Sequence, residues 1–248
     1  MLDDANVIQQ RDPEGALGIA ADQWQQVKYD AIVEDGDHDG RDVTKVVITG
    51  MGGSALAGLL AKALLEEELF IPFEVVRGYE LPTYVDAGTL VIASSYSGNT
   101  EETISALEQA RGRGAQIAVL AAGGKLVEVA KAEGIARVVL PGGMQPRMAM
   151  LANMRALVTL LVHFGVVSDT LNSDLAATAD WLHEQSAQWV PDVSTDKNDA
   201  KQLALLAVGK TPVIYGGRLT GPVAYKWKIS WNENAKNVAF WNELPEFN

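Results

Sequence analysis

Short runs of β-branched and other apolar residues alternate with longer amphipathic stretches through the first 150 residues of the chain. The apolar runs have the length of strands and are bounded by glycine, proline or serine. In chain order they cover residues 43–49, 72–78, 89–95, 115–122 and 136–143. The stretches with helical spacing cover residues 16–33, 59–69, 99–114 and 125–134. Strands and helices alternating in this way predict a parallel sheet with helices on both faces.

The pattern changes near Pro146. An apolar stretch at 146–167 predicts a long buried helix, and residues 169–189 and 196–208 also have helical spacing. Only one further strand is predicted, at 211–217. Because a single strand cannot bury itself, this region is expected to be mostly helical and to begin a sheet without completing it. We therefore predict two domains, residues 1–150 and residues 151–248.

Composition is typical of a globular protein, with 48% hydrophobic and 21% charged residues. The formal net charge of −12 does not favour nucleic acid as a partner. Without cysteine, disulfides and thiolate metal sites are excluded. The first residues lack the layout of a signal peptide, and the most apolar stretch, ALVTLLVHFGVV, is too short to cross a bilayer. We expect a soluble cytoplasmic protein with no membrane partner.

A glycine-rich loop, GMGGSA at residues 50–55, joins the first predicted strand to the next helix. Such loops bind ligands in open parallel sheets, because they lie at the carboxyl edge and the helix amides point at them. The loop also fits the dinucleotide pattern G-x-G-x-x-A, which needs an acid at the end of the following strand. Arg77 closes that strand and Glu74 opens it, so a nicotinamide site is not favoured. The alternative without a ligand is a tight strand-to-helix turn.

The loop SSYSGNT gathers hydroxyl groups at the end of the strand at 89–95. Its four hydroxyl residues are Ser94, Ser95, Ser97 and Thr100. Gly98 permits a close approach of the backbone, and the helix that follows supplies amides and the positive end of its dipole. One hydroxyl, at Ser97 or Thr100, is accounted for by capping of this helix, but four are not. The loop therefore predicts a site for a compact dianion such as a phosphate monoester.

The acidic loop DGDHDG matches the first half of a calcium-binding loop through Asp35, Asp37, Asp39 and Gly40. The twelfth position holds Val46 where a calcium loop has glutamate, and a strand follows where a helix belongs. A solvated turn without metal is the favoured interpretation.

Four segments together resemble the bifunctional phosphoglucose/phosphomannose isomerase family, whose subunits contain two sugar isomerase (SIS) subdomains. They are GMGGSALAG, SSYSGNTEET, PGGMQPR and WNENAKNVAFWNELPE. SxSGNT marks SIS domains in general, whereas the ENAK segment narrows the resemblance to this family. The resemblance covers the chain from about residue 43 to its end and implies a three-layer, flavodoxin-like subdomain followed by the beginning of a second SIS subdomain.

The resemblance implies an aldose-ketose isomerase without a cofactor, which interconverts glucose 6-phosphate or mannose 6-phosphate with fructose 6-phosphate through a cis-enediol. By position in the motifs, the residues implied to bind substrate are Ser95, Ser97 and Thr100 at the phosphate, and Gly52, Gly53 and Ser54 at the sugar. Arg147 would face the developing charge and Glu233 would be the base. Without the resemblance, Glu233 is equally a surface carboxylate near Lys236, and Arg147 a surface residue at a helix start.

Family members also carry a histidine directly after the segment at which this chain ends, assigned to ring opening and often acting across a homodimer interface. His38, His163 and His183 do not occupy that motif. We therefore expect the chain to be a fragment of a longer enzyme. A phosphosugar-sensing module without turnover is the alternative function, and it has no use for a base or a charge-stabilising arginine at Glu233 and Arg147.

Overall fold

The computed structural model describes residues 2–36 and 40–246. The chain forms two compact units, one of residues 29–174 and one of residues 1–28 together with 175–248. The first unit extends past residue 150, where the sequence pattern predicts a division between domains. The division into two SIS subdomains itself stays a prediction.

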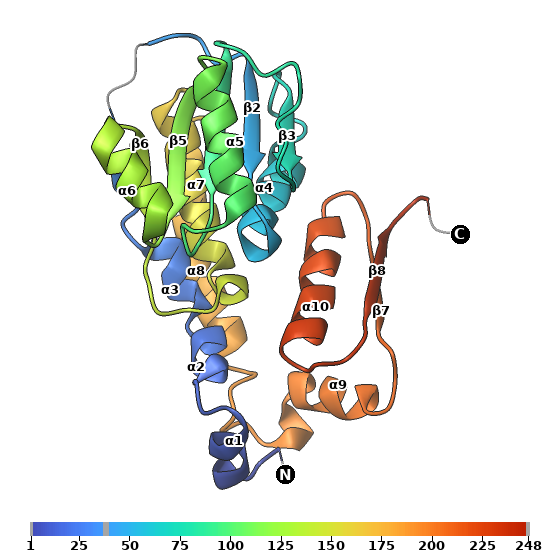
Figure 1. Ribbon diagram of the computed structural model, residues 1–248. Helices are drawn as coiled ribbons and strands as arrows, with labels where there is room; N and C mark the ends of the chain where they lie inside the picture. The colour runs from blue at the N-terminus through green and yellow to red at the C-terminus, as the bar shows by residue number, and fades with distance from the viewer. Residues whose placement is uncertain (1, 37–39, 247–248) are drawn as a thin grey trace. The chain divides into compact units, whose positions relative to one another are not determined.

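The unit of residues 29–174 is built on a six-stranded sheet with the spatial order β1-β6-β5-β4-β2-β3 (Figure 1). Its strands are β1 (Val33–Glu34), β2 (Lys45–Thr49), β3 (Phe73–Val76), β4 (Thr89–Ser94), β5 (Gln116–Ala121) and β6 (Ala136–Val139). All neighbouring strands are parallel except β1, which pairs antiparallel with β6. The chain moves to one side of β2 to form β3 and then to the other side to form β4. The strand order therefore reverses between β2 and β4, which is where open α/β sheets bind their ligands.

Four helices cover the two faces of this sheet: α4 (Gly52–Leu65), α5 (Glu101–Gly112), α6 (Gly124–Glu133) and α7 (Met150–His163). Helices α5 and α6 lie on one face, and α4 and α7 pack against each other on the other (Figure 1). Helix α5 buries Ala106 and Leu107 against Val91 of β4 and Val119 of β5. All six residues of β4 are buried, as expected for a central parallel strand. The predicted three-layer α/β fold is confirmed.

The second unit is mostly helical, as predicted. Its helices are α1 (Ala5–Arg11), α2 (Ala16–Ala21), α3 (Gln23–Lys28), α8 (Thr170–Ser186, whose first turn belongs to the other unit), the short 3-10 turn η2 (Thr195–Lys197), α9 (Asp199–Ala207) and α10 (Gly221–Glu233). Lys201 donates to Asp3 at 2.7 Å and lowers the pKa of that carboxyl, which ties the N-terminal segment to α9. Within the described ranges, no helix is long and apolar enough to cross a membrane.

Two predictions, one at the boundary between the units and one within the second unit, are wrong in detail. A single helix was expected over 16–33, but α2 ends at Ala21, α3 follows from Gln23, and Val33 already belongs to β1. A second strand, β8 (Phe240–Glu243), pairs in parallel with β7 (Val213–Gly216). The sequence FWNE does not alternate between apolar and polar residues, so it gives little strand signal. In the structure this strand is mostly exposed.

Candidate functional site

The loops after β2 and β4 meet where the strand order reverses. The amide of Tyr96 donates to Ser54 Oγ at 3.0 Å. Ser94 Oγ lies 3.5 Å from the carbonyl oxygen of Ser54, at the limit of a hydrogen bond. The glycine loop and the serine loop, predicted separately from the sequence, are therefore joined at one edge of the sheet.

The three predicted phosphate ligands form one cluster of hydroxyls. Ser95 Oγ lies 2.7 Å from Thr100 Oγ1 and 3.4 Å from Ser97 Oγ, and it accepts from the amide of Gly98 at 3.1 Å. Ser95 is only 1% exposed, whereas Ser97 is exposed and Thr100 is half-buried. Ser95 thus lies buried at the bottom of the cluster, and Ser97 and Thr100 form its accessible side.

The amino ends of α4 and α5 have no side-chain cap. Thr100 occupies the N-cap position of α5, but its hydroxyl makes no hydrogen bond to the helix amides and faces Ser95 instead. Met51 precedes α4 and makes no capping bond either. Capping therefore does not explain the hydroxyl of Thr100. Uncapped first-turn amides at two helix ends favour an anion at this edge.

The carboxylates in the first turn of α5 influence a neighbouring phenol. The charge of Glu102 raises the pKa of Tyr79, and desolvation of the phenol, the charge of Glu101 and a hydrogen bond to Glu101 raise this pKa further. The hydroxyl of Tyr79 lies 3.5 Å from Glu101 Oε2. Glu101 is thus engaged on the side of α5 that faces the loop after β3.

The serine loop is fixed by a close contact with the start of α6. Gly98 has a φ of 71°, and a Cβ at this position would lie 1.8 Å from the carbonyl oxygen of Gly123. Asn99 Oδ1 accepts from the amide of Lys125 at 3.0 Å, which caps α6 because Gly123 has no side chain to do so. Asn99 was not predicted as a site residue, although it lies inside the SGNT motif.

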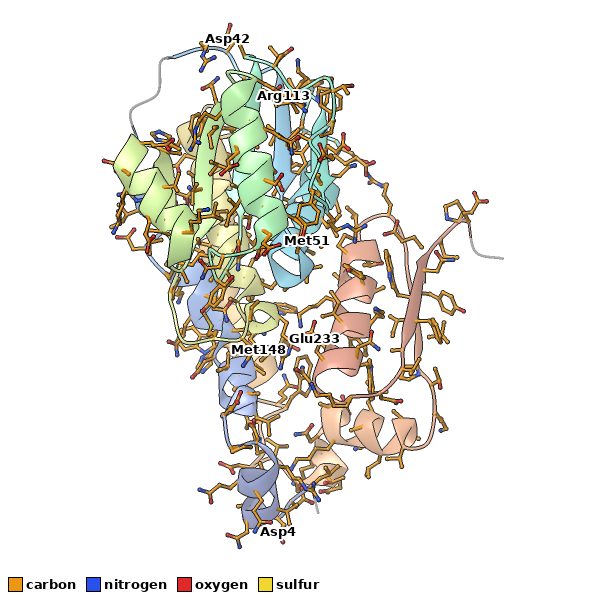
Figure 2. The ribbon with its side chains drawn as sticks, viewed as in Figure 1. Asp4, Asp42, Met51, Arg113, Met148 and Glu233 are labelled. Atoms are coloured by element: carbon orange, nitrogen blue, oxygen red, sulfur yellow. The ribbon has the colours of Figure 1, made fainter. Side chains whose placement is uncertain are left out.

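A third loop, residues 141–147, brings Arg147 to the same edge. Arg147 lies in the short turn η1 (Pro146–Met148) and is half-buried. A Cβ at Gly53 would lie 2.7 Å from the oxygen of Pro146 and 3.1 Å from Cα of Arg147, so the two backbones touch. Figure 2 shows Met51 and Met148 at this edge of the unit.

The structure therefore brings together seven of the eight predicted site residues. They are Gly52, Gly53, Ser54, Ser95, Ser97, Thr100 and Arg147. Tyr96, which is buried between the loops, was not among the predicted site residues. The one available signal was an aromatic residue inside a loop of serines.

Glu233, the predicted base, lies in the other compact unit, at the last position of α10, and is exposed. The chain turns immediately after it. Asn232 Nδ2 donates to the oxygen of Asn237 at 2.9 Å, and Lys236 has a φ of 53°, in the left-handed region. The role of Glu233 stays a prediction.

The acidic loop that resembles half a calcium site is only partly described. The carboxylate of Asp35 forms an ion pair with the buried Arg137. Asp37, His38 and Asp39 lie outside the described residues. Among the residues that the structure describes, no group of three or more acids and histidines is arranged to hold a metal ion.

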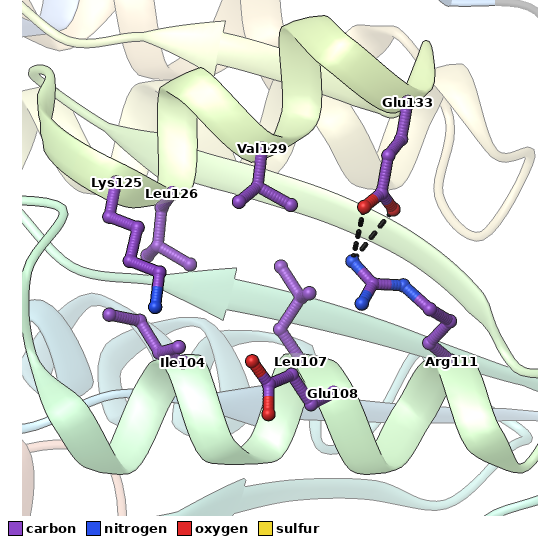
Figure 3. A pocket seen from close by; sticks show the side chains of 8 residues that line it. All are labelled: Ile104, Leu107, Glu108, Arg111, Lys125, Leu126, Val129 and Glu133. Carbon is purple, nitrogen blue, oxygen red and sulfur yellow. Dashed lines mark hydrogen bonds and ion pairs between the residues drawn. The ribbon is translucent and has the colours of Figure 1, made fainter.

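A small hollow lies between α5 and α6, on the outer side of these helices (Figure 3). It is lined by Ile104, Leu107, Glu108, Arg111, Lys125, Leu126, Val129 and Glu133. Arg111 Nη2 donates to both carboxylate oxygens of Glu133 at 2.7 Å and links the two helices across it. Its volume of about 70 Å³ is well below that of a typical small-molecule site, so it is not a candidate for sugar phosphate.

Two family models match the chain. A SIS domain matches residues 41–161, and a bacterial phospho-glucose isomerase C-terminal SIS domain matches residues 196–248. A bifunctional phosphoglucose/phosphomannose isomerase of Caldicellulosiruptor bescii is 42% identical over 84% of this chain and 61% of its own. A D-glucosamine-6-phosphate 4-epimerase of Sulfolobus acidocaldarius is 32% identical over 92% of this chain and 69% of its own.

Among solved structures, the tagatose-6-phosphate ketose/aldose isomerase of Escherichia coli is similar, with a TM-score of 0.57 and 17% identity over 82% of this chain and 57% of that chain. At this identity the similarity concerns the fold. This chain spans less than two thirds of the length of the Caldicellulosiruptor relative.

Proposed function

We propose, from the premise that this chain belongs to the bifunctional phosphoglucose/phosphomannose isomerase family of SIS-domain proteins, that it interconverts glucose 6-phosphate or mannose 6-phosphate with fructose 6-phosphate. The observation that carries this proposal is the hydroxyl cluster of Ser95, Ser97 and Thr100 beside two uncapped helix ends. Hydroxyls and free amides together suit the doubly charged phosphate that all three sugars share.

In this proposal the phosphate binds to Ser97, Thr100 and the first amides of α5. Ser95 accepts from the amide of Gly98 and orients the other two hydroxyls from below. The sugar then extends toward Gly52, Gly53 and Ser54, whose loop is joined to the serine loop through Tyr96.

The reaction we assign transfers protons only. Neither the substrate as a whole nor the protein is oxidised or reduced. Glu233 takes the proton from C2 of the open-chain aldose, and the electron pair of that C–H bond forms the cis-enediol. The proton is returned at C1, while a hydroxyl proton moves from O2 to O1, so that the ketose results. Arg147 stabilises the negative charge on the enediolate oxygen during both steps. Because no hydride or electron leaves the substrate, the reaction needs no redox cofactor.

The family also supports several proposals about the context of the site. We propose that the protein is a cytoplasmic homodimer and that each subunit contains two SIS subdomains, one up to about residue 150 and one from residue 151. The matches to two separate SIS models support the second point. Light scattering that gives twice the subunit mass would support the dimer.

Turnover separates the isomerase from the alternative of a phosphosugar-sensing module. A sensor binds fructose 6-phosphate without forming glucose 6-phosphate or mannose 6-phosphate. An enzyme-coupled assay for both aldose phosphates, run with the natural full-length protein, tests the proposal directly. Saturable binding without formation of either product would reject it.

Replacing Thr100 with valine is expected to weaken substrate binding. Valine keeps the shape of threonine but removes the hydroxyl beside Ser95. A hydrogen bond to a charged group contributes about 1.5–3 kcal/mol, so KM should rise by about tenfold to a hundredfold with a smaller change in kcat. The matched control is Thr178→Val, since the hydroxyl of Thr178 donates to the oxygen of Leu175 within its own helix. Equal KM values for both variants would contradict the phosphate assignment.

Replacing Arg147 with alanine is expected to lower kcat by about a hundredfold to a thousandfold, the range seen when one group that stabilises a developing oxyanion is removed. KM should change less, because the phosphate ligands are untouched. Arg11→Ala, at the exposed end of α1, is the control for loss of one positive charge. An unchanged kcat in Arg147→Ala would remove Arg147 from the mechanism.

A further inference from the structure

Tyr96 occupies the centre of the serine loop but points into the protein. It is 7% exposed, while the next residue, Ser97, is exposed. Its hydroxyl donates to the oxygen of Pro141 at 2.7 Å and accepts from the amide of Met144 at 3.1 Å. The phenol therefore uses both its donor and its acceptor on the loop that leads to Arg147.

The backbone of Tyr96 is engaged on two other segments. Its amide donates to Ser54 Oγ at 3.0 Å, and its carbonyl oxygen accepts from the amide of Ala122 at 2.9 Å. Tyr96 thus contacts the glycine loop, the segment before α6 and the Arg147 loop. Two of these segments, the glycine loop and the Arg147 loop, carry residues to which we assign contacts with the sugar phosphate.

The loop that carries Arg147 depends on such contacts for its position. Most of residues 141–146 are exposed, and Gly143 has a φ of 86°. An exposed loop with glycine and proline has little apolar packing of its own. Its contacts with the site include the Tyr96 hydroxyl at Pro141 and Met144, and the close backbone contact of Gly53 with Pro146.

We propose that Tyr96 is a positioning residue for the isomerase reaction. Through its hydroxyl, Tyr96 holds the loop that carries Arg147 at a fixed position relative to the bound phosphate. This inference rests on the proposed function, because it gives Tyr96 a role that acts through Arg147. Tyr96 itself does not contact the sugar in this account. Its hydroxyl is hydrogen-bonded to Pro141 and Met144, and its ring is buried.

The Tyr96→Phe variant tests this role by removing one oxygen atom. With the loop less constrained, Arg147 is in place for a smaller fraction of the time. In the natural full-length protein, kcat should fall by about tenfold to a hundredfold, as expected for a displacement of about 1 Å in a reacting site. KM and the inhibition constant of inorganic phosphate should stay within about twofold of the wild-type values, because the phosphate-binding residues of the serine loop are unchanged. Tyr84→Phe is the matched control, because its hydroxyl bonds to Glu74 away from the three loops.

A double-mutant cycle with Arg147→Ala separates positioning from a general loss of structure. If Tyr96 acts through Arg147, Tyr96→Phe lowers kcat in the wild type but has no further effect in the Arg147→Ala background. The same fold-loss in both backgrounds, or no loss in the wild type, would overturn the inference. If Arg147→Ala leaves kcat unchanged while the wild type isomerises, the role of Arg147 fails and the role of Tyr96 fails with it. If the wild type forms no product, it is the proposed function that fails.

A second variant reaches the same loop from its other end, in case Tyr96→Phe folds poorly. In Gly53→Ala, the new Cβ lies 2.7 Å from the oxygen of Pro146 and must displace the backbone next to Arg147. Its kcat should also fall by about tenfold or more, with phosphate inhibition retained, and the loss should again disappear in the Arg147→Ala background. A Gly53→Ala protein with wild-type kcat would count against control of Arg147 by this loop.

Discussion

Replacing Glu233 with glutamine is expected to lower kcat by about a hundredfold to ten thousandfold, the contribution of a positioned general base. Glutamine has the size of glutamate but cannot take a proton from carbon, so the proton transfer between C1 and C2 stops at its first step. The affinity for fructose 6-phosphate, measured by isothermal titration calorimetry, should stay close to that of the wild type. The residues that we propose as phosphate ligands, which would provide this affinity, belong to the serine loop.

The control for this experiment is Glu128→Gln, an exposed glutamate on α6 outside the predicted site. It should leave both kcat and affinity unchanged. If Glu233→Gln retained wild-type turnover, Glu233 would be a surface carboxylate, and the base would have to be sought elsewhere. Loss of affinity together with turnover would instead assign Glu233 a role in binding or in local structure near the end of α10.

Replacing Gly98 with alanine is expected to abolish sugar-phosphate binding and to destabilise the unit of residues 29–174. The added Cβ would meet the carbonyl oxygen of Gly123 at 1.8 Å, and the φ of 71° is unfavourable for alanine. The contact is with backbone, so a side-chain rotation cannot relieve it. The serine loop has to move away from the start of α6, and Ser97 and Thr100 move with it.

The matched control lies in the same helix region. Gly112 is in the last turn of α5, has no positive φ, and an added Cβ meets no atom within 4 Å. Gly112→Ala should keep full affinity and raise the stability by up to about 1 kcal/mol, because alanine is the better helix former. Thermal unfolding monitored by circular dichroism, with and without fructose 6-phosphate, measures both effects. Retained stabilisation by ligand in Gly98→Ala would contradict the assigned role of this loop.

The sheet was predictable because its strands carry strong local signals. The runs that form β2, β4 and β5 are continuous and apolar, and the structure buries nearly all of their residues. The strands β1 and β8 were not predicted, because each carries little strand signal in the sequence. The first has two residues and the second is mostly exposed, so their pairing depends on tertiary contacts rather than on periodicity.

The grouping of the candidate site residues was also predictable, since glycine and hydroxyl residues at strand ends must gather at one edge of a parallel sheet. The internal order of the site was not. Nothing in the sequence shows that Ser95 is buried beneath Ser97 and Thr100. The hydrogen bonds of the Tyr96 hydroxyl with Pro141 and Met144 join segments more than forty positions apart. A tyrosine among serines carries no local sign of such bonds.

Proton exchange at C2 tests the central claim most directly. Fructose 6-phosphate is incubated with the natural full-length protein in D₂O, and the products are followed by proton NMR. We predict that glucose 6-phosphate or mannose 6-phosphate forms, with deuterium at C2 in part of the product, because a protein carboxylate that shuttles the proton exchanges it with solvent. Fructose 6-phosphate that binds but stays unchanged, or a product inverted at C4 instead, would contradict the account.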